Sequence, residues 1–171
     1  MENAADRRLF WSVAGVILVA DLITKVVAEA YLARRLPLEV FGEFVQLRLV
    51  YNEGAAFGIY LGEYSRWIFF TLAVVALFVL GSMVRATRPG DRLRLWALAL
   101  LCGGATGNLL DRLRSPEGVV DFLDIGVGLR RWPTFNVADS AITVGAIALA
   151  VSLWLEGRAQ QGAKEARVTD L

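Results

Sequence analysis

The sequence predicts an all-α membrane protein with four transmembrane helices and a small outward-facing region of β-sheet and loops. Hydrophobic residues make up 56% of the chain, and the mean hydropathy is +0.51, both high for a soluble domain. A helix needs about 20 mostly apolar residues to cross the hydrocarbon core of a bilayer. Such stretches occupy residues 9–28, 67–84, 95–110 and 137–155. We therefore expect one four-span domain over residues 1–158.

The positions of the basic residues predict the orientation of the spans. Lysine and arginine near short loops mark the cytoplasmic side of a membrane protein. They lie before the first span, between the second and third, and after the fourth: Arg7, Arg8, Arg85, Arg88, Arg92, Arg94, Arg158, Lys164 and Arg167. Both termini are therefore expected in the cytoplasm, with segments 29–66 and 111–136 on the outer face. Residues 159–171 are rich in charge, Gln and Gly, and we expect a disordered cytoplasmic tail there.

The first span has a second interpretation. Arg7 and Arg8 precede an apolar run, and residues 28–30 (AEA) resemble the cleavage site of a secretory signal peptide. The run is long for a signal peptide, however. Its removal would leave three spans and reverse the pairing of charges with loops, so a retained span is the preferred interpretation.

The outward segments contain the predicted sheet. Residues 45–51 alternate in hydrophobicity as a short strand does. Asn52 and Gly54 follow in a small, turn-prone stretch where the backbone could approach another element closely, although a simple turn is the alternative. Residues 119–124 form a short, mostly apolar segment with two acids.

The absence of histidine restricts the chemistry that this chain can perform. The sequence has no histidine and a single cysteine, Cys102, within an apolar run. A Ser-His-Asp or Cys-His system, an HExxH zinc site and a Cys/His metal cluster are therefore excluded. We expect Cys102 to be a packing residue, and we expect neither a metal nor a cofactor.

Ionisable and amide side chains gather at the outer ends of the spans. A charge at the centre of a span costs about 2.5 to 3.5 kcal/mol on insertion, so each needs a partner or a role. Asp21 and Lys25 are four residues apart on one helix face and could form a local ion pair. The small residues 103–107 favour close helix packing, and the polar residues that follow them in the third span share one face: Asn108, Asp111 and Arg112. They could instead anchor the helix end.

Two further acids could form a catalytic pair with each other. Asn136 and Asp139 are three residues apart at the outer start of the fourth span, where Asp139 or Ser140 could merely cap the helix. Asp121 could be a solvated loop acid, although its apolar neighbours would hold its carboxylate against apolar surface. Carboxylates are the only acid or base groups left in number on the outer face. Two of them can share one proton and activate a water, which gives a bell-shaped pH profile.

These residues fall within five motifs that occur in a recognisable order. The motifs are residues 21–25 (DLITK), 52–57 (NEGAAF), 103–112 (GGATGNLLDR), 119–122 (VVDF) and 135–140 (FNVADS). In this order and spacing they resemble the lipoprotein signal peptidase family, also called type II signal peptidase, over about residues 21–155.

The resemblance implies a function and a set of site residues. It implies an aspartic endopeptidase of the bacterial inner membrane that removes the signal peptide from diacylglyceryl-modified prolipoproteins, just before the lipidated cysteine. The implied catalytic residues are Asp121 and Asp139. The implied supporting and substrate-binding residues are Asp21, Lys25, Asn52, Gly54, Asn108, Asp111, Arg112 and Asn136. The expected partners are lipid-modified prolipoproteins, membrane phospholipids and globomycin-type inhibitors, with no nucleic acid, and we expect a monomer.

Three other classes of function compete with this interpretation. A small transporter or channel would need a carboxylate near the middle of the bilayer. A Ser/Lys peptidase would pair Ser140 with a deprotonated Lys25, whereas the neighbouring Asp21 favours a charged lysine. A structural assembly protein would not need so many outward polar groups.

Overall fold

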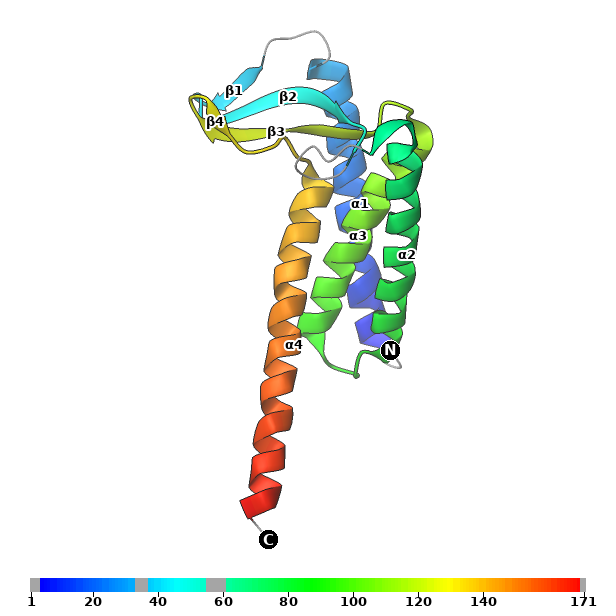
Figure 1. Ribbon diagram of the computed structural model, residues 1–171, viewed down its shortest axis with the longest axis vertical. Coiled ribbons are helices and arrows are strands. Elements are labelled where there is room, and N and C mark those ends of the chain that lie inside the picture. Colours follow the sequence, from blue (N-terminus) through cyan, green and yellow to red (C-terminus); the bar gives the residue numbers. More distant parts are fainter. Residues whose placement is uncertain (1–3, 33–36, 55–60, 170–171) are drawn as a thin grey trace.

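Four long helices run along one direction, and a small sheet lies across one end of them (Figure 1). This computed structural model describes residues 4–32, 37–54 and 61–169, and side chains up to residue 162. The helices are α1 (Ala4–Leu32), α2 (Ser65–Ala86), α3 (Arg92–Arg114) and α4 (Val137–Thr169), and a 3-10 turn, η2 (Gly62–Tyr64), precedes α2. Both ends of the chain lie at the end of the helices opposite the sheet.

The helices expose apolar side chains that a soluble protein would bury. Val16, Phe78 and Ile147 are 66%, 79% and 62% exposed, on three different helices. All four helices are long and apolar enough to cross a membrane, and contiguous apolar surface of this extent suits contact with lipid. The four predicted spans are confirmed, and each helix extends beyond the predicted range at one or both ends.

Helix α3 is the central element of the bundle because it packs against α1, α2 and α4. Two glycines allow its close contacts. A Cβ atom at Gly103 would lie 2.8 Å from the carbonyl oxygen of Ala14 in α1, and one at Gly104 would lie 2.5 Å from that of Ala138 in α4. The small residues of the third span therefore allow close helix packing, as the sequence predicted.

The sheet has four antiparallel strands in the order β1-β2-β3-β4. The strands are β1 (Leu38–Phe41), β2 (Val45–Asn52), β3 (Val119–Val127) and β4 (Arg130–Arg131). Phe122 of β3 packs with Ala28 and Leu32 at the end of α1. This contact holds the sheet against the end of α1, and Val137 at the start of α4 packs against the same cluster. Strand β3 therefore lies beside the end of α1 and the start of α4.

Two segments differ from their expected conformations. Asp121 was expected in an outward loop or a short segment, but it lies in strand β3. The strand forms because β2 supplies backbone partners along residues 119–125. Residues 159–169 continue α4 as a helix instead of the disordered tail that their polarity suggested. Ala, Gln, Lys, Glu and Arg predominate there, and these residues have high helix propensity.

Replacing Gly104 with alanine should destabilise the bundle. The added Cβ would press on the carbonyl of Ala138 and on Ile142, and overpacking of this kind costs about 1 to 3 kcal/mol. We expect a lower thermal unfolding temperature in detergent, measured by circular dichroism. Gly157→Ala is the matched control, because a Cβ at that position of α4 meets no atom within 4 Å. Equal unfolding temperatures for the two variants would contradict this view of the α3–α4 contact.

Candidate active site

A buried lysine joins three polar side chains below the sheet. Lys25 of α1 is 0% exposed. Its Nζ lies 2.7 Å from Oδ2 of Asp21, 2.7 Å from Oδ2 of Asp111 and 2.9 Å from Oδ1 of Asn108. Lys25 therefore donates a hydrogen bond to Asn108 and forms ion pairs with the two carboxylates. Arg114 Nε lies 3.1 Å from Oδ1 of Asp111 and offsets the second negative charge.

The two carboxylates of this cluster also hold backbone from other elements. Oδ1 of Asp21 accepts the N–H of Ala138 in the first turn of α4, at 2.9 Å. Oδ2 of Asp111 accepts the N–H of Val120 in β3, at 3.3 Å. The expected local ion pair of Asp21 with Lys25 is therefore present, and it is one part of a cluster that joins α1, α3, α4 and β3. Loss of the first span by cleavage would remove its central cation.

Gly107 provides the space that Asp21 occupies. A Cβ atom at position 107 would overlap Oδ2 of Asp21. A larger residue would therefore push this carboxylate away from Lys25. The third glycine of the small-residue stretch thus serves the polar cluster, whereas Gly103 and Gly104 serve helix packing.

The segment before α4 pairs with β3 and brings the start of the helix to Asp121. The N–H groups of Phe122 and Leu123 lie 3.0 and 2.8 Å from the carbonyl oxygen of Phe135, and the N–H of Phe135 donates to Leu123 at 3.0 Å. The next residue, Asn136, is 0% exposed. Its Nδ2 lies 2.8 Å from Oδ1 of Asp121 and 3.1 Å from Oδ1 of Asn108.

Asn136 and Asp139 form a reciprocal cap at the start of α4. The N–H of Asp139 donates to Oδ1 of Asn136 at 2.8 Å, and the N–H of Asn136 donates to Oδ2 of Asp139 at 3.2 Å. This is the arrangement of a capping box. The other oxygen of Asp139, Oδ1, accepts a hydrogen bond from Nδ2 of Asn108 at 2.8 Å. The cap was expected from Asp139 or Ser140, whereas Asn136 is the capping residue and Asp139 completes the box three residues later. This arrangement orients the Asp139 carboxylate relative to Asn108.

Asp121 is buried, with amide donors on both oxygens. It is 2% exposed. Besides the contact with Asn136, its Oδ2 accepts a hydrogen bond from Nδ2 of Asn52 at 3.1 Å. Burial, and next the negative charge of Asp139, raise the pKa of Asp121 from 3.8 to about 7, while the hydrogen bonds from the two amides and the charge of Lys25 oppose the increase. Near neutral pH this carboxyl group can therefore hold or release a proton.

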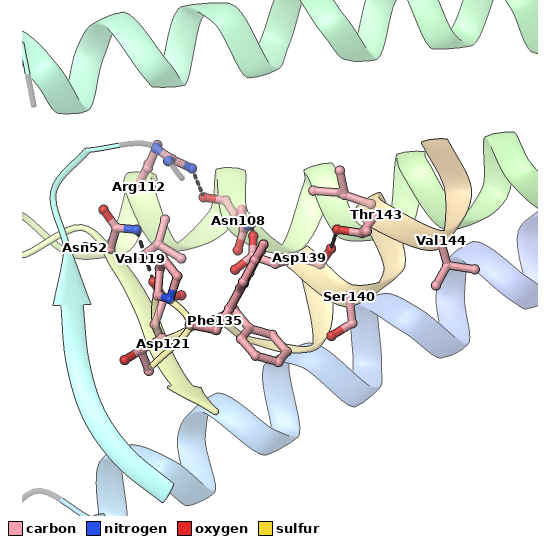
Figure 2. Close-up of a pocket in the computed structure, with 14 residues that line it drawn as sticks. Asn52, Asn108, Arg112, Val119, Asp121, Phe135, Asp139, Ser140, Thr143 and Val144 are labelled. Carbon is pink, nitrogen blue, oxygen red and sulfur yellow. Dashed lines mark hydrogen bonds between the residues drawn. The ribbon is translucent and has the colours of Figure 1, made fainter. Parts of the chain in front are cut away.

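Asp121 and Asp139 line one cavity of about 500 Å³. Figure 2 shows Asn52 and Asn108 reaching these carboxylates from β2 and α3. Polar groups occupy one part of the wall, and Phe135, Ile142 and Val144 supply an apolar part. An adjoining hollow of about 480 Å³ also has Asn52 and Asp121 in its wall. The two acids therefore lie where polar and apolar surfaces meet.

Of the eight expected supporting residues, Asn136 binds both aspartates, Gly54 lines the adjoining hollow, and the other six divide into two groups. Asn52, Asn108 and Arg112 line the cavity, whereas Asp21, Lys25 and Asp111 lie behind it in the buried cluster. Arg112 donates from Nη2 to the carbonyl oxygen of Gly54 at 2.9 Å and from Nη1 to that of Asn108 at 3.1 Å. Its Nε is buried without a hydrogen-bond partner among the described residues. Residues 55–57 of the second motif lie outside the described residues.

Several residues around the cavity were missed by the sequence analysis. Ile142, Thr143 and Val144 continue the wall along α4, and Trp132 and Pro133 close it from the preceding loop. Thr143 could have been identified because it lies one helical turn after Asp139, and its hydroxyl donates to the Asp139 carbonyl at 2.8 Å. Arg66 was missed as well. It donates to the carbonyl oxygens of Arg112 and Leu113 at 2.6 and 3.1 Å, and so holds the last turn of α3.

Substitution of Lys25 by methionine should strongly destabilise the protein. It leaves the buried carboxylates of Asp21 and Asp111 without their shared cation, and breaking a buried ion pair costs about 3 to 5 kcal/mol. We expect a large fall in the unfolding temperature in detergent. The triple variant Lys25→Met, Asp21→Asn, Asp111→Asn should recover part of the loss because it also removes the unpaired charges. A triple variant less stable than Lys25→Met would contradict this account.

Comparison with known proteins identifies the family. The model of the signal peptidase (SPase) II family, Peptidase_A8, matches residues 13–155. The chain is 37% identical to a lipoprotein signal peptidase of Treponema denticola over 96% of this chain and 99% of that protein. It is 42% identical to one of Paraburkholderia phytofirmans over 80% and 79% of the two chains. Two solved chains, each described as a bacterial membrane enzyme, align with TM-scores of 0.76 and 0.73 at 29% identity. They cover 86% and 84% of this chain, and 88% and 91% of their own lengths. The chain belongs to the signal peptidase II family.

Proposed function

We propose that this protein is a membrane aspartic endopeptidase that removes the signal peptide from diacylglyceryl-modified prolipoproteins, just before the lipidated cysteine. The observation that carries the proposal is the placement of Asp121 and Asp139 on one cavity wall, with Asn136 bonded to both. Family membership supports the substrate class. The apolar wall beside the acids suits a substrate whose acyl chains remain in the bilayer.

The environments of the two aspartates suggest different roles in the reaction. Asp139 lies at the N-terminus of α4, where negative charge is favoured, and it accepts N–H donors on both oxygens. We assign it as the base that takes a proton from the attacking water. Asp121, whose pKa is raised by burial, holds a proton and donates it to the oxygen of the scissile carbonyl. The water oxygen bonds to the carbonyl carbon to give a tetrahedral intermediate. As the C–N bond breaks, Asp139 gives the proton that it took to the amine nitrogen, and Asp121 takes a proton back from a hydroxyl of the intermediate, which restores both acids.

Arg112 and Asn52 are placed to support this chemistry. The guanidinium of Arg112, which lines the cavity, would bind a backbone carbonyl of the substrate. Asn52 is oriented by the N–H of Gly54, which donates to its Oδ1 at 3.0 Å, so its amide nitrogen faces Asp121. We therefore assign Arg112 to substrate binding and Asn52 to positioning and tuning of Asp121. A globomycin-type inhibitor would compete for the same cavity.

We place the protein in the bacterial inner membrane with both termini in the cytoplasm and the sheet outside. Arg85, Arg88, Arg92 and Arg94 surround the loop between α2 and α3, at the end of the bundle opposite the sheet. An excess of arginine marks the cytoplasmic side. The cavity would then lie near the outer surface, where a lipid-anchored cysteine presents its scissile bond. We propose that a single chain is the active unit.

The competing functions lose support from the geometry. The buried acids Asp21, Asp111 and Asp121 gather at the sheet end, not at the middle of the spans where a transporter would need one. Lys25 forms ion pairs with two carboxylates and donates to Asn108, so it is not placed to act as a neutral base. The Ser140 hydroxyl donates to the Asn136 carbonyl at 3.0 Å. These contacts disfavour the transporter and the Ser/Lys peptidase.

Substitution of either proposed catalytic aspartate by asparagine should abolish cleavage. We expect Asp121→Asn and Asp139→Asn each to lower kcat at least about 100-fold. This value is the lower end of the typical contribution of a general acid or base. The assay is cleavage of a lipidated precursor in detergent, with folding checked by thermal unfolding. Asp124→Asn is the matched control. That acid is equally buried on the same strand, but pairs with Arg131 at 2.7 Å and does not line the cavity. Full activity in either Asp121→Asn or Asp139→Asn would refute the proposal.

The pH dependence of kcat/KM should show an alkaline limb near pH 7. As the pH rises through the pKa of Asp121, about 7, this residue loses its proton and both acids become ionised. Activity should therefore fall above pH 7, as the alkaline side of the bell-shaped profile of a carboxylate pair. The profile of the free enzyme reports these ionisations. Constant activity from pH 6 to pH 9 would contradict the assignment of Asp121 as the acid.

Removal of the Asn52 amide should move the alkaline limb to higher pH. The hydrogen bond from Asn52 stabilises ionised Asp121 and holds its pKa down. In Asn52→Ala the pKa should rise, so activity should persist to higher pH even if kcat is lower. A purely structural role for Asn52 would reduce kcat without moving the limb, and that result would remove its assigned tuning role.

A further inference from the structure

Another cavity lies between α1 and α2, and it shares no lining residue with the cavity of Asp121 and Asp139. It has a volume of about 500 Å³, and its wall combines residues of α1, α2 and α3. Its apolar lining residues include Phe10, Leu18, Leu77 and Val84. On α2 the lining runs from Leu77 to Arg85, which is about 12 Å at a rise of 1.5 Å per residue. We call this cavity the α1–α2 groove.

Glycines on two helices leave the groove open. Gly15 of α1 and Gly81 of α2 line it, and a Cβ atom at either position would meet no atom within 4 Å. They differ from Gly103 and Gly107 of α3, where atoms of α1 occupy the space that a side chain would need. The space beside Gly15 and Gly81 is therefore unfilled by protein and lies at membrane depth.

The end of the groove nearest the chain termini is basic and aromatic. Arg85 lines it and Trp11 is 68% exposed beside it. Arg7 precedes Trp11 by one helical turn and therefore shares its face. Neither Arg7 nor Arg85 has an ion-pair partner among the described residues, in contrast to Arg88 and Arg94, which pair with Glu156. Arginine and tryptophan at this level typically contact phospholipid headgroups.

We infer that the α1–α2 groove binds an anionic phospholipid from the leaflet on the side of the chain termini. The phosphate would bind Arg85, with Arg7 adding positive charge, and one acyl chain would lie along Gly15 and Gly81 toward Thr106. Basic pockets between helices on the cytoplasmic side of a membrane are a known type of anionic-lipid site. The positive charge at the end of the groove favours an anionic lipid as the occupant over an apolar helix. The site does not depend on the peptidase function proposed above.

Native mass spectrometry of the full-length protein in detergent tests this site. The probe is an equimolar mixture of phosphatidylglycerol and phosphatidylcholine with identical chains. We expect the wild type to retain one phosphatidylglycerol in preference to phosphatidylcholine. Arg85→Gln should reduce that preference about fivefold, which corresponds to about 1 kcal/mol for one basic residue near an anionic headgroup. Gly81→Leu, whose side chain enters the open space, should remove the bound lipid of either kind.

Matched variants distinguish the groove from general effects. Arg92→Gln removes an exposed arginine that does not line the groove, and Gly157→Leu adds the same side chain to an open position of α4. Both should retain the lipid as the wild type does. If Gly81→Leu fails to fold, as judged by thermal unfolding, Gly15→Leu fills the groove from the opposite wall.

Three results of the lipid assay would overturn the inference. They are equal retention of the two lipids by the wild type, unchanged retention in a folded groove-filling variant, and equal losses in the groove and control variants. Displacement of a co-purifying membrane protein by Gly81→Leu, without loss of bound lipid, would assign the groove to a helix and would also overturn it. The readout is lipid binding, so failure here leaves the catalytic proposal unaffected, and loss of peptidase activity leaves the lipid site unaffected.

Discussion

One buried ammonium group, that of Lys25, fixes the relative positions of the elements that form the cavity. It contacts side chains of α1 and α3, and the carboxylates that it pairs with bind the backbone of α4 and β3. A buried charge tolerates few arrangements of its partners, because each unsatisfied donor or acceptor costs free energy. The cluster therefore specifies one geometry. It contributes this specificity even if an apolar cluster of similar volume would be as stable.

Asn108 and Asn136 transmit this geometry to the two aspartates. Asn108 accepts from Lys25 and donates to Asp139, while Asn136 contacts Asn108, Asp121 and Asp139. An asparagine offers both a donor and an acceptor, so it can join a cation to a carboxylate in one step. The aspartates lie on different elements, yet both are positioned through the same buried cation. Asn108 contacts Lys25 directly, and Asn136 contacts Asn108.

Much of the architecture could be predicted from the sequence, and its local patterns explain why. The apolar runs predicted the spans, and the alternation of residues 45–51 predicted strand β2. The spacing of Asn136 and Asp139 predicted a shared direction because both lie within one helical turn. The partners of Lys25 were only partly predictable. Asp21 is four residues away, whereas Asn108 is separated from Lys25 by 83 residues, and such contacts depend on how α1 packs on α3.

Other features depended on tertiary context that local sequence does not encode. Residues 119–127 contain two aspartates and a glycine, which are uncommon in strands, and they adopt the strand conformation because β2 lies beside them. The pairing of Phe135 with β3 joins segments separated by a loop without regular periodicity. The polar composition of residues 159–169 suggested disorder, whereas helix propensity and continuity with α4 produce a helix.

The two aspartates differ in their relation to the stability of the fold. Asp139 completes the capping box of α4, so its carboxylate helps to hold the start of the helix in place. Asp121 binds more protons in the folded state than in the unfolded state between its unperturbed pKa of 3.8 and its raised pKa of about 7. Its ionisation therefore reduces stability as the pH rises through that range. Selection for folding alone would thus preserve Asp139 and would favour the loss of Asp121. An aspartate that persists at position 121 in a descendant lineage would then report selection on chemistry, whereas one at position 139 would report selection on chemistry and folding together.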